Sequence, residues 1–413
     1  MLPLQHARKR VRSFLAEINR LRESEFPYEQ SKGALALIQE VAERHLESLD
    51  ALTDENDIDT VINECGMTVT FLYDNLPFLG FILRSTNIRN GFEVYFPLLR
   101  LARAILGEDT KLIISSEWDY SPFIYGGIPE LPGFVLIGLP APESANPLLM
   151  PLAGHELGHS VWIKHKCKDI FATEIREKIL SEIKARWTEY TILFPGDLTD
   201  ADLETDLFAL QTWAPAFDWA INQAEEEFCD YIGIAIFGEA YLHAFAYLLA
   251  PGMSDERPFH YPNMRRRVAD MKEAATTMGV ATPQSYEQCF IDMVEPDDAT
   301  EREKKFLLSL ADTASQSIRS QLIEKARTLI LNSGFIPRSN EIIKNIVGRF
   351  ELVVPAEDTR GLSNILNAGW VALNDDSFWR KTNLSEMKDT TLKELILKTI
   401  EVYEIEERTR VSR

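Results

Sequence analysis

The stretch HELGHSVWIKH, residues 155–165, contains the pattern HExxH and a third histidine. In a helix, residues four apart lie on one face, so His155 and His159 can turn their rings to the same place. Glu156 directly follows the first histidine. Two histidines at this spacing can bind one metal ion, and the glutamate can take a proton from a water molecule beside it. The stretch therefore predicts a metal site with its own base.

Zn²⁺ is the cofactor that this pattern predicts. Zinc lowers the pKa of a bound water to about 7 and polarises a carbonyl group. Glu156 would accept the proton of that water and pass it to the leaving amine. The residues around the motif are uncharged, as a helix buried beneath an active site needs: Leu152, Ala153, Leu157, Gly158, Ser160 and Val161. The alternative is a helix whose two histidines are only packed.

A catalytic zinc site needs a third protein ligand, and His165 is one candidate. The stretch resembles the metzincin pattern HExxHxxGxxH at its three histidines, but Trp162 stands in place of the glycine. Tryptophan strongly resists the left-handed backbone that a sharp turn needs. We therefore expect the helix to run past His165, which would lie away from the other two histidines as a solvated residue. A metzincin-like protease that uses His165 stays the alternative.

The stretch AEEEFCDYIG, residues 224–233, offers the other candidate. Of its three glutamates, only Glu226 has an aspartate four residues later, Asp230. This pattern resembles the ExxxD helix of gluzincin zinc peptidases, a likeness that covers residues from about 110 to 295. The resemblance implies that Glu226 is the third zinc ligand and that Asp230 hydrogen-bonds a zinc-bound histidine. Glu227 is the main rival of Glu226.

The stretch ERPFHYPNMRRRVADM, residues 256–271, resembles the His-Pro…Arg segment that follows the third ligand in several gluzincins. The resemblance implies that His260 or Tyr261 faces the substrate and donates to the oxyanion, and that Arg266 anchors the loop or binds a carbonyl. His243 and Tyr241 are alternative donors, but both lie within an apolar helical run. The non-functional alternative is a loop before a helix with solvated arginines. The resemblance also implies that FVLIGLP, residues 134–140, is an edge strand that holds an extended substrate.

The predicted fold class is mainly α, of α+β type, with a small β-sheet. KLIISSEW and FVLIGLP are short apolar runs rich in β-branched residues and predict strands with a loop between them. Elsewhere, apolar residues recur at three- and four-residue spacing, which predicts helices. We predict an N-terminal helical region over residues 1–108, a zincin-like catalytic region over 109–295 and a C-terminal helical region over 296–413.

Charge and composition exclude some classes of partner. The 413-residue chain has a formal net charge of −21, which repels phosphate backbones and predicts no nucleic-acid partner. The basic start of the chain has no apolar segment behind it, so we expect no signal peptide. The apolar run over residues 231–250 contains Glu239 and His243, so we expect a buried pair of core helices and no membrane contact. Four widely spaced cysteines fit reduced thiols in a cytoplasmic protein.

These observations together predict a cytoplasmic zinc metallopeptidase of gluzincin type, whose partner is a peptide or protein substrate. The expected reaction is hydrolysis of a peptide bond by zinc-activated water. The peptide substrate is implied by the resemblance, because the site chemistry alone would also suit another amide. An alternative of a different class is a regulatory protein that binds zinc without catalysis. The sequence contains no signal for the oligomeric state.

Overall fold

The computed structural model is mainly helical, as predicted, with 76% of the chain in helices. It describes residues 3–53, 56–88, 91–118, 123–125, 128–143, 145–196, 199–252, 257–291, 301–375 and 387–411. The chain forms two compact units. The first comprises Met1–Arg103 and Gly107–Ala145, and the second comprises Ala104–Leu106 and Asn146–Arg413.

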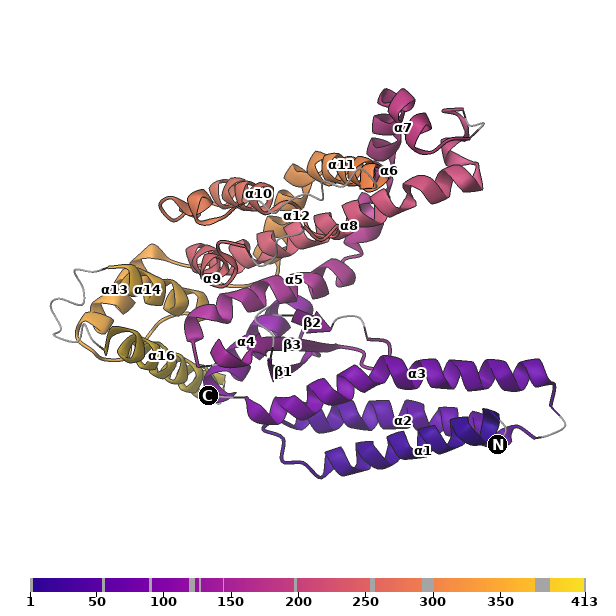
Figure 1. Ribbon diagram of the computed structural model, residues 1–413. Helices are drawn as coiled ribbons and strands as arrows, with labels where there is room; N and C mark the ends of the chain where they lie inside the picture. Colours follow the sequence, from indigo (N-terminus) through magenta and orange to yellow (C-terminus); the bar gives the residue numbers. More distant parts are fainter. Residues whose placement is uncertain are drawn as a thin grey trace. The chain divides into compact units, whose positions relative to one another are not determined.

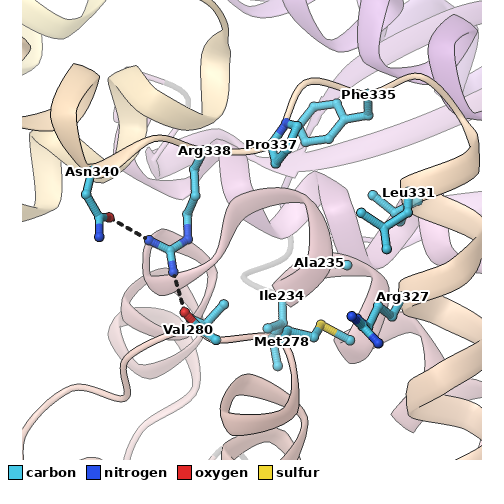
Figure 2. A pocket seen from close by; sticks show the side chains of 12 residues that line it. Ile234, Ala235, Met278, Val280, Arg327, Leu331, Phe335, Pro337, Arg338 and Asn340 are labelled. Carbon is cyan, nitrogen blue, oxygen red and sulfur yellow. Dashed lines mark hydrogen bonds between the residues drawn. The ribbon is translucent and has the colours of Figure 1, made fainter.

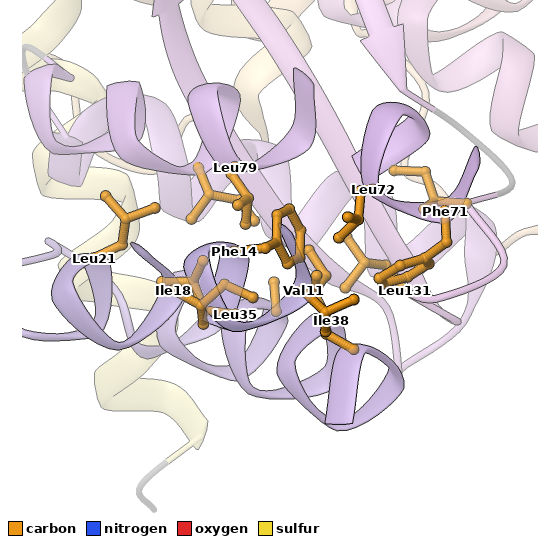
Figure 3. Packing of buried hydrophobic residues seen from close by; sticks show 14 of the residues in the cluster. Val11, Phe14, Ile18, Leu21, Leu35, Ile38, Phe71, Leu72, Leu79 and Leu131 are labelled. Carbon is orange, nitrogen blue, oxygen red and sulfur yellow. The ribbon is translucent and has the colours of Figure 1, made fainter. Parts of the chain in front are cut away.

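Three long helices build the first unit. They are α1 (Pro3–Arg22), α2 (Glu29–Ala51) and α3 (Ile58–Arg84), which pack side by side (Figure 1). Each helix turns apolar side chains inward at helical spacing. Their common core contains Val11, Phe14, Ile18, Leu21, Leu35, Ile38, Phe71, Leu72 and Leu79 (Figure 3). The helix α4 (Gly91–Leu106) follows, and Gly107, with a φ of 109°, comes directly after its end.

The sheet has three strands among the described residues. They are β1 (Lys111–Glu117), β2 (Phe123–Tyr125) and β3 (Phe134–Pro140), in the order β1-β3-β2. The strands β1 and β3 lie at the two predicted places and are parallel, while β2 pairs antiparallel with residues 136–138 of β3. The prediction that β3 is an edge strand is wrong, because β3 lies between β1 and β2 in the sheet. The prediction of a loop between the strands missed β2.

The sheet belongs to the first unit. Ile113, Phe134 and Leu136 are buried in the same core as the side chains of α1, α2 and α3. The two units divide near residue 145. The predicted regions 1–108, 109–295 and 296–413 stay a prediction. The predicted boundary at residue 295 lies outside the described residues.

The second unit contains helices in the described part of the chain from residue 146 onward, arranged around α8. They are α5 (Ala153–Lys164), α6 (Cys167–Ala185), α7 (Trp187–Leu193), α8 (Leu207–Phe237), α9 (Glu239–Leu249), α10 (Met264–Thr277), α11 (Arg302–Ser317), α12 (Arg319–Asn332), α13 (Asn340–Glu351), α14 (Leu362–Asn374) and α16 (Lys388–Val411). The long α8 packs against α5, α6, α10, α11 and α12 (Figure 1). The apolar run over residues 231–250 forms the expected helix pair, in which Gly238 separates α8 from α9 with a φ of 59°.

One segment, Ile58–Asn87, is long and apolar enough to cross a membrane by length and composition. It consists of α3 and the short turn after it, and 39% of its most apolar window is buried within the described structure. A core helix of a globular unit passes the same test, and α3 packs on α1 and α2. The expectation of no membrane contact therefore stays a prediction.

Candidate metal centre

The helices α5 and α8 approach each other closely at two glycines of α5. A Cβ on Gly154 would lie 3.0 Å from the Cα of Gly233, and a Cβ on Gly158 would lie 2.7 Å from the Cα of Cys229. The distance at Gly158 is shorter than real Cβ contacts, and the distance at Gly154 is tighter than most of them, so the two helices can pack this closely because α5 has no side chain at these positions. The α5 side chains beside the glycines therefore reach the polar groups of α8.

Both histidines of the HExxH motif face one carboxylate on α8. The Nε2 atom of His155 lies 3.3 Å from Oε2 of Glu226, and the Nε2 atom of His159 lies 3.8 Å from Oε1 of Glu226. The exposed fractions of the three side chains are 13%, 18% and 12%, so the group is largely buried but still meets solvent. The fold thus brings together the three residues that the sequence suggested as zinc ligands.

The second nitrogen of each ring is held by a further carboxylate. The Nδ1 atom of His155 donates to Asp230 at 2.9 Å, and the Nδ1 atom of His159 donates to Glu225 at 2.8 Å. When such a ring is neutral, donation from Nδ1 leaves the lone pair of Nε2 free for a metal ion, and both Nε2 atoms are on the side of Glu226. Asp230 lies where the resemblance implied, whereas Glu225 was not among the predicted site residues.

The donor atoms suit a zinc ion in both type and spacing. Ligand atoms at about 2.0–2.1 Å from a tetrahedral zinc ion stand about 3.3 Å from one another. This equals the distance of 3.3 Å between His155 and Glu226, and the distance of 3.8 Å for His159 needs only a small shift. Two imidazoles and one carboxylate also form a ligand set that leaves the fourth position of zinc open. The residues therefore fit a catalytic type of zinc site.

Negative charge exceeds positive charge around the two rings. Burial alone would lower the pKa of His155, but hydrogen bonds and charge from Asp230 and Glu226 raise it to about 10. Burial raises the pKa of Glu226, but its hydrogen bond with His155 and the nearby positive charges bring it below its usual value. Apart from the two histidines, the ionisable side chains of the group are the carboxyl groups of Glu156, Glu225, Glu226 and Asp230 and the guanidinium of Arg267. Such a group favours a bound cation.

Asp230 is completely buried and is held by donors from two other helices. Arg267 of α10 donates from Nε to Oδ2 at 2.6 Å and from Nη2 to Oδ1 at 2.9 Å. The hydroxyl of Tyr241 donates to Oδ1 at 2.6 Å. Burial raises the pKa of Asp230, but the charge of Arg267 and the hydrogen bond with His155 outweigh burial and hold it well below its usual range. Asp230 is therefore ionised and fixed in position beside His155.

Glu227, the predicted rival of Glu226, is engaged by a different cation. Its Oε1 accepts from Nη2 of Arg266 at 2.6 Å, and its side chain is buried. Burial raises the pKa of Glu227 to about 7, although Arg266 opposes this shift. Arg266 also donates to Asp312 of α11 and pairs with Asp270 of α10. Arg266 is thus an anchor between helices, and Glu226 remains the glutamate beside the histidines.

Glu156, the predicted base, is buried next to both histidines. Burial raises its pKa, and the positive charges of His155 and His159 only partly reverse the shift. A carboxylate with a raised pKa holds a transferred proton more readily, which is what a general base near neutral pH needs. The environment of Glu156 therefore suits the role that the motif suggests.

Tyr261 and His260, the two predicted oxyanion donors, have different surroundings. The charge of Glu226, together with burial, raises the pKa of Tyr261 to about 12, and Glu156 adds to the shift. The phenol therefore keeps its proton at neutral pH and can donate a hydrogen bond near these carboxylates. His260 is exposed, and its described ring contact is with Tyr261 at 4.5 Å between centroids. Tyr261 is the better candidate.

Cys229 gives a second candidate ligand set. One ligand atom from each of His155, His159 and Cys229 lies within 4.8 Å of the other two. Burial, and next the charge of Glu226, raise the pKa of the Cys229 thiol well above its usual value. A bound zinc ion deprotonates a coordinating thiol, so Cys229 stays an alternative third ligand to Glu226.

The helix α5 ends before His165, so the expectation that it runs past this residue is wrong. It ends at Lys164, and α6 begins at Cys167. Between them, Lys166 has a φ of 49° and takes the left-handed conformation that the sequence argument reserved for glycine. Trp162 itself stays helical, as expected, and it is buried. The turn therefore comes four residues later than in a metzincin motif.

His165 lies among positive charges. Burial and the charges of Lys164 and Lys325 lower its pKa. Positive neighbours disfavour a metal cation at this ring. No contact in the described part of the chain links His165 to His155 or His159. The position of His165 therefore gives no support to a metzincin-like site.

Glu225 and Arg267 are the residues of this group that sequence reasoning missed. Glu225 could have been found, because each metal-binding histidine needs an acceptor for its Nδ1 and His159 had none assigned. Arg267 carried no such signal. It follows Arg266 directly, and consecutive residues on a helix point about 100° apart, so only the packing of α10 decides which arginine meets Asp230.

The geometry of this centre stands without support from known relatives. Comparison of the chain with protein-family models, with curated proteins and with solved structures finds no match in any of the three. The candidate site therefore rests on its own residues and on the resemblance of two short motifs.

Proposed function

We propose that the chain is a zinc-dependent metallopeptidase of gluzincin type. The observation that most supports this is the arrangement of His155 and His159, whose Nε2 atoms face Glu226 at 3.3 and 3.8 Å while their Nδ1 atoms are held by other carboxylates. These three residues would hold the ion. When bound, zinc supplies Lewis-acid chemistry, which acidifies a water molecule and polarises the carbonyl of the scissile bond.

The chain's own residues then have distinct roles. Glu156 accepts a proton from the attacking water as the water oxygen bonds to the carbonyl carbon. It later gives that proton to the leaving amine as the C–N bond breaks. The phenol of Tyr261 donates a hydrogen bond to the carbonyl oxygen as negative charge develops there. Asp230 and Glu225 hold the two histidine rings in place. Peptide is the proposed substrate because the HExxH and ExxxD motifs resemble those of gluzincins.

Zinc content and peptide cleavage of the full-length chain test the proposal. We expect one zinc ion per chain and cleavage of members of a peptide library. Glu156→Gln should keep zinc and lower the cleavage rate by about a hundredfold or more, because general-base catalysis contributes that much. Glu177→Gln, an exposed change on α6, is the matched control and should cleave normally. A chain that binds zinc but shows no Glu156-dependent cleavage would instead be a zinc-binding regulatory protein, and the proposal would be wrong.

The ligand set is tested separately. Glu226→Gln should lose zinc, whereas Cys229→Ser and His165→Ala should each keep it. Retention of zinc by Glu226→Gln together with loss by Cys229→Ser would move the third ligand to Cys229. Loss by His165→Ala would support the metzincin alternative. Circular dichroism of each variant separates loss of a ligand from loss of the fold.

A further inference from the structure

A pocket of about 350 Å³ lies in the second unit, apart from the metal centre. It is bounded by the C-terminal ends of α8 and α10, by α12 and by the segment that joins α12 to α13 (Figure 2). Its walls combine polar groups with an apolar part that includes Ile234, Met278, Val280, Leu331 and Phe335. A concave site of this size can cover a small ligand.

The guanidinium of Arg338 is fixed at one side of this pocket. Its Nη1 donates to the side chain of Asn340 at 3.2 Å, and its Nη2 donates to the carbonyl of Gly279 at 3.1 Å. Its Cδ and Nε lie over Gly238, where a Cβ would come within 2.7 and 2.5 Å of them. Gly238 also has a φ of 59°, so a glycine is needed there for two reasons. The side chain is therefore held by three separate elements and is positioned in advance of any ligand.

Arg338 keeps most of its capacity to bind an anion. A guanidinium has five N–H donors, and the two hydrogen bonds of Arg338 are both to neutral groups. The acceptors that it meets in the described part of the chain include no carboxylate. Arg327 lines the pocket from another side, where its partner Glu324, at 3.2 Å, is an exposed residue of the same helix. Figure 2 shows the two arginines on either side of Ile234 and Met278.

We propose that this pocket binds a carboxylate that is joined to a short apolar chain. A planar guanidinium with free N–H groups matches the two oxygens of a carboxylate, and fixing it beforehand reduces the cost of binding. The apolar part of the wall supplies the complementary surface for the rest of the ligand. A free fatty acid and the C-terminus of a peptide with an apolar last residue both have this chemistry.

The site is independent of the proposed peptidase activity, although it shares a helix with the metal centre. Ile234 follows Glu226 on α8 by about 12 Å along the helix axis at 1.5 Å per residue. The binding residues are different, and none of the proposed zinc ligands lines the pocket. Binding can therefore be measured on the full-length chain whether or not it cleaves peptides.

Calorimetric titration with two pairs of probes tests the proposal. Octanoate is compared with octylamine, which has the same apolar chain but a positive head group. An acetylated peptide ending in a free leucine carboxylate is compared with its amidated form. We expect binding of at least one carboxylate, with the uncharged or positive counterpart binding at least about tenfold more weakly. The arm that binds identifies the source of the carboxylate.

Two variants locate the binding. Arg338→Gln should weaken the carboxylate by about tenfold to a hundredfold, whereas Arg410→Gln, an exposed arginine of α16, should not. Leu331 is 59% exposed and lines the pocket, so Leu331→Asp should block the anion without disturbing the core. Leu352→Asp, at a residue 69% exposed outside the pocket, is its control. Leu331→Asp keeps the test valid if Arg338→Gln fails to fold.

Three results would overturn the proposal. They are an absence of binding by both carboxylates at millimolar concentration, equal binding by the carboxylates and their counterparts, and binding that neither Arg338→Gln nor Leu331→Asp weakens.

Discussion

Gly158 of α5 and Cys229 of α8 lie so close together that a single added carbon atom would collide with the neighbouring backbone. A Cβ on Gly158 would stand 2.7 Å from the Cα of Cys229. This contact sets the distance between the helix that carries both histidines and the helix that carries Glu226.

Replacing Gly158 by alanine should therefore disturb both stability and metal binding. We expect Gly158→Ala to lower the free energy of unfolding by about 1–3 kcal/mol, the usual cost of overpacking, and to weaken zinc binding because the helices must separate. Urea unfolding and a zinc titration measure the two effects. Gly66→Ala is the control, because Gly66 is an exposed glycine of α3 with nothing within 4 Å of an added Cβ. Unchanged stability in Gly158→Ala would mean that the helices do not need this close contact.

Glu225 should matter for zinc although it is not a proposed ligand. Removing the partner of a ligand's second nitrogen usually costs about ten- to a hundredfold in metal affinity. We expect such a loss for Glu225→Ala, and a smaller one for Glu225→Gln, whose amide oxygen can still accept from Nδ1 of His159. Competition with a chelator measures the affinity, and Glu177→Ala is the control. An affinity equal to that of the wild type in Glu225→Ala would exclude a part for Glu225 in orienting His159.

The phenol of Tyr261 should affect the rate of peptide cleavage and not the zinc content. If the proposed function holds, Tyr261→Phe should lower kcat by about a hundredfold or more and leave zinc content unchanged, because it removes one donor to the developing oxyanion. Steady-state kinetics with a cleaved peptide and metal analysis measure this. Tyr73→Phe, at an exposed tyrosine of α3, is the control. A drop in zinc content would show instead that Tyr261 supports the metal centre itself.

His243 should make the stability of the chain depend on pH in the acidic range. Its ring stacks on Trp370 of α14 at 5.1 Å, and burial lowers its pKa from 6.5 to about 4. Between these two values the unfolded chain binds a proton that the folded chain does not. The free energy of unfolding should therefore fall as pH falls through this window, and the contribution of His243 should level off below about 4.

His243→Phe, which keeps an aromatic ring but cannot titrate, isolates this effect. We expect the wild type to lose more stability than the variant between pH 6.5 and about 4, as measured by urea unfolding at several pH values. The carboxylates that titrate in the same range are common to both proteins and cancel in the comparison. Parallel stability curves would show that His243 is not kept neutral by the fold.

The chemistry of the candidate centre could be anticipated from short-range patterns. His155 and His159 share a helix face by spacing alone, and Glu226 was singled out because Asp230 follows it by one helical turn. The meeting of the two helices depends on packing between residues some seventy positions apart, so it could not be derived from spacing. The glycines Gly154 and Gly158 were the local sign of that close approach.

The errors have local and nonlocal causes. Lys166 adopts a left-handed conformation at a helix boundary, a minority choice for a lysine that no residue preference predicts. The strand β2 has three residues and lies in SPFIYGGIPELPG, residues 121–133, whose glycines and prolines indicate a loop. Its pairing with β3 is a tertiary contact that this local pattern concealed. The apolar strands alone also do not reveal which helices cover them, so their place in the first unit could not be derived from the sequence.

The run of three glutamates on α8 also fixes how that helix is rotated. Glu225 meets His159, Glu226 meets His155, and Glu227 meets Arg266. Consecutive residues are about 100° apart around the helix axis, so each carboxylate reaches its partner in a single rotation of α8. Turning the helix by one residue would exchange one glutamate for the next and break a buried ion pair, at a cost of about 3–5 kcal/mol. The three glutamates are chemically identical, but each has a different partner. Together they therefore favour one rotation of α8 about its axis.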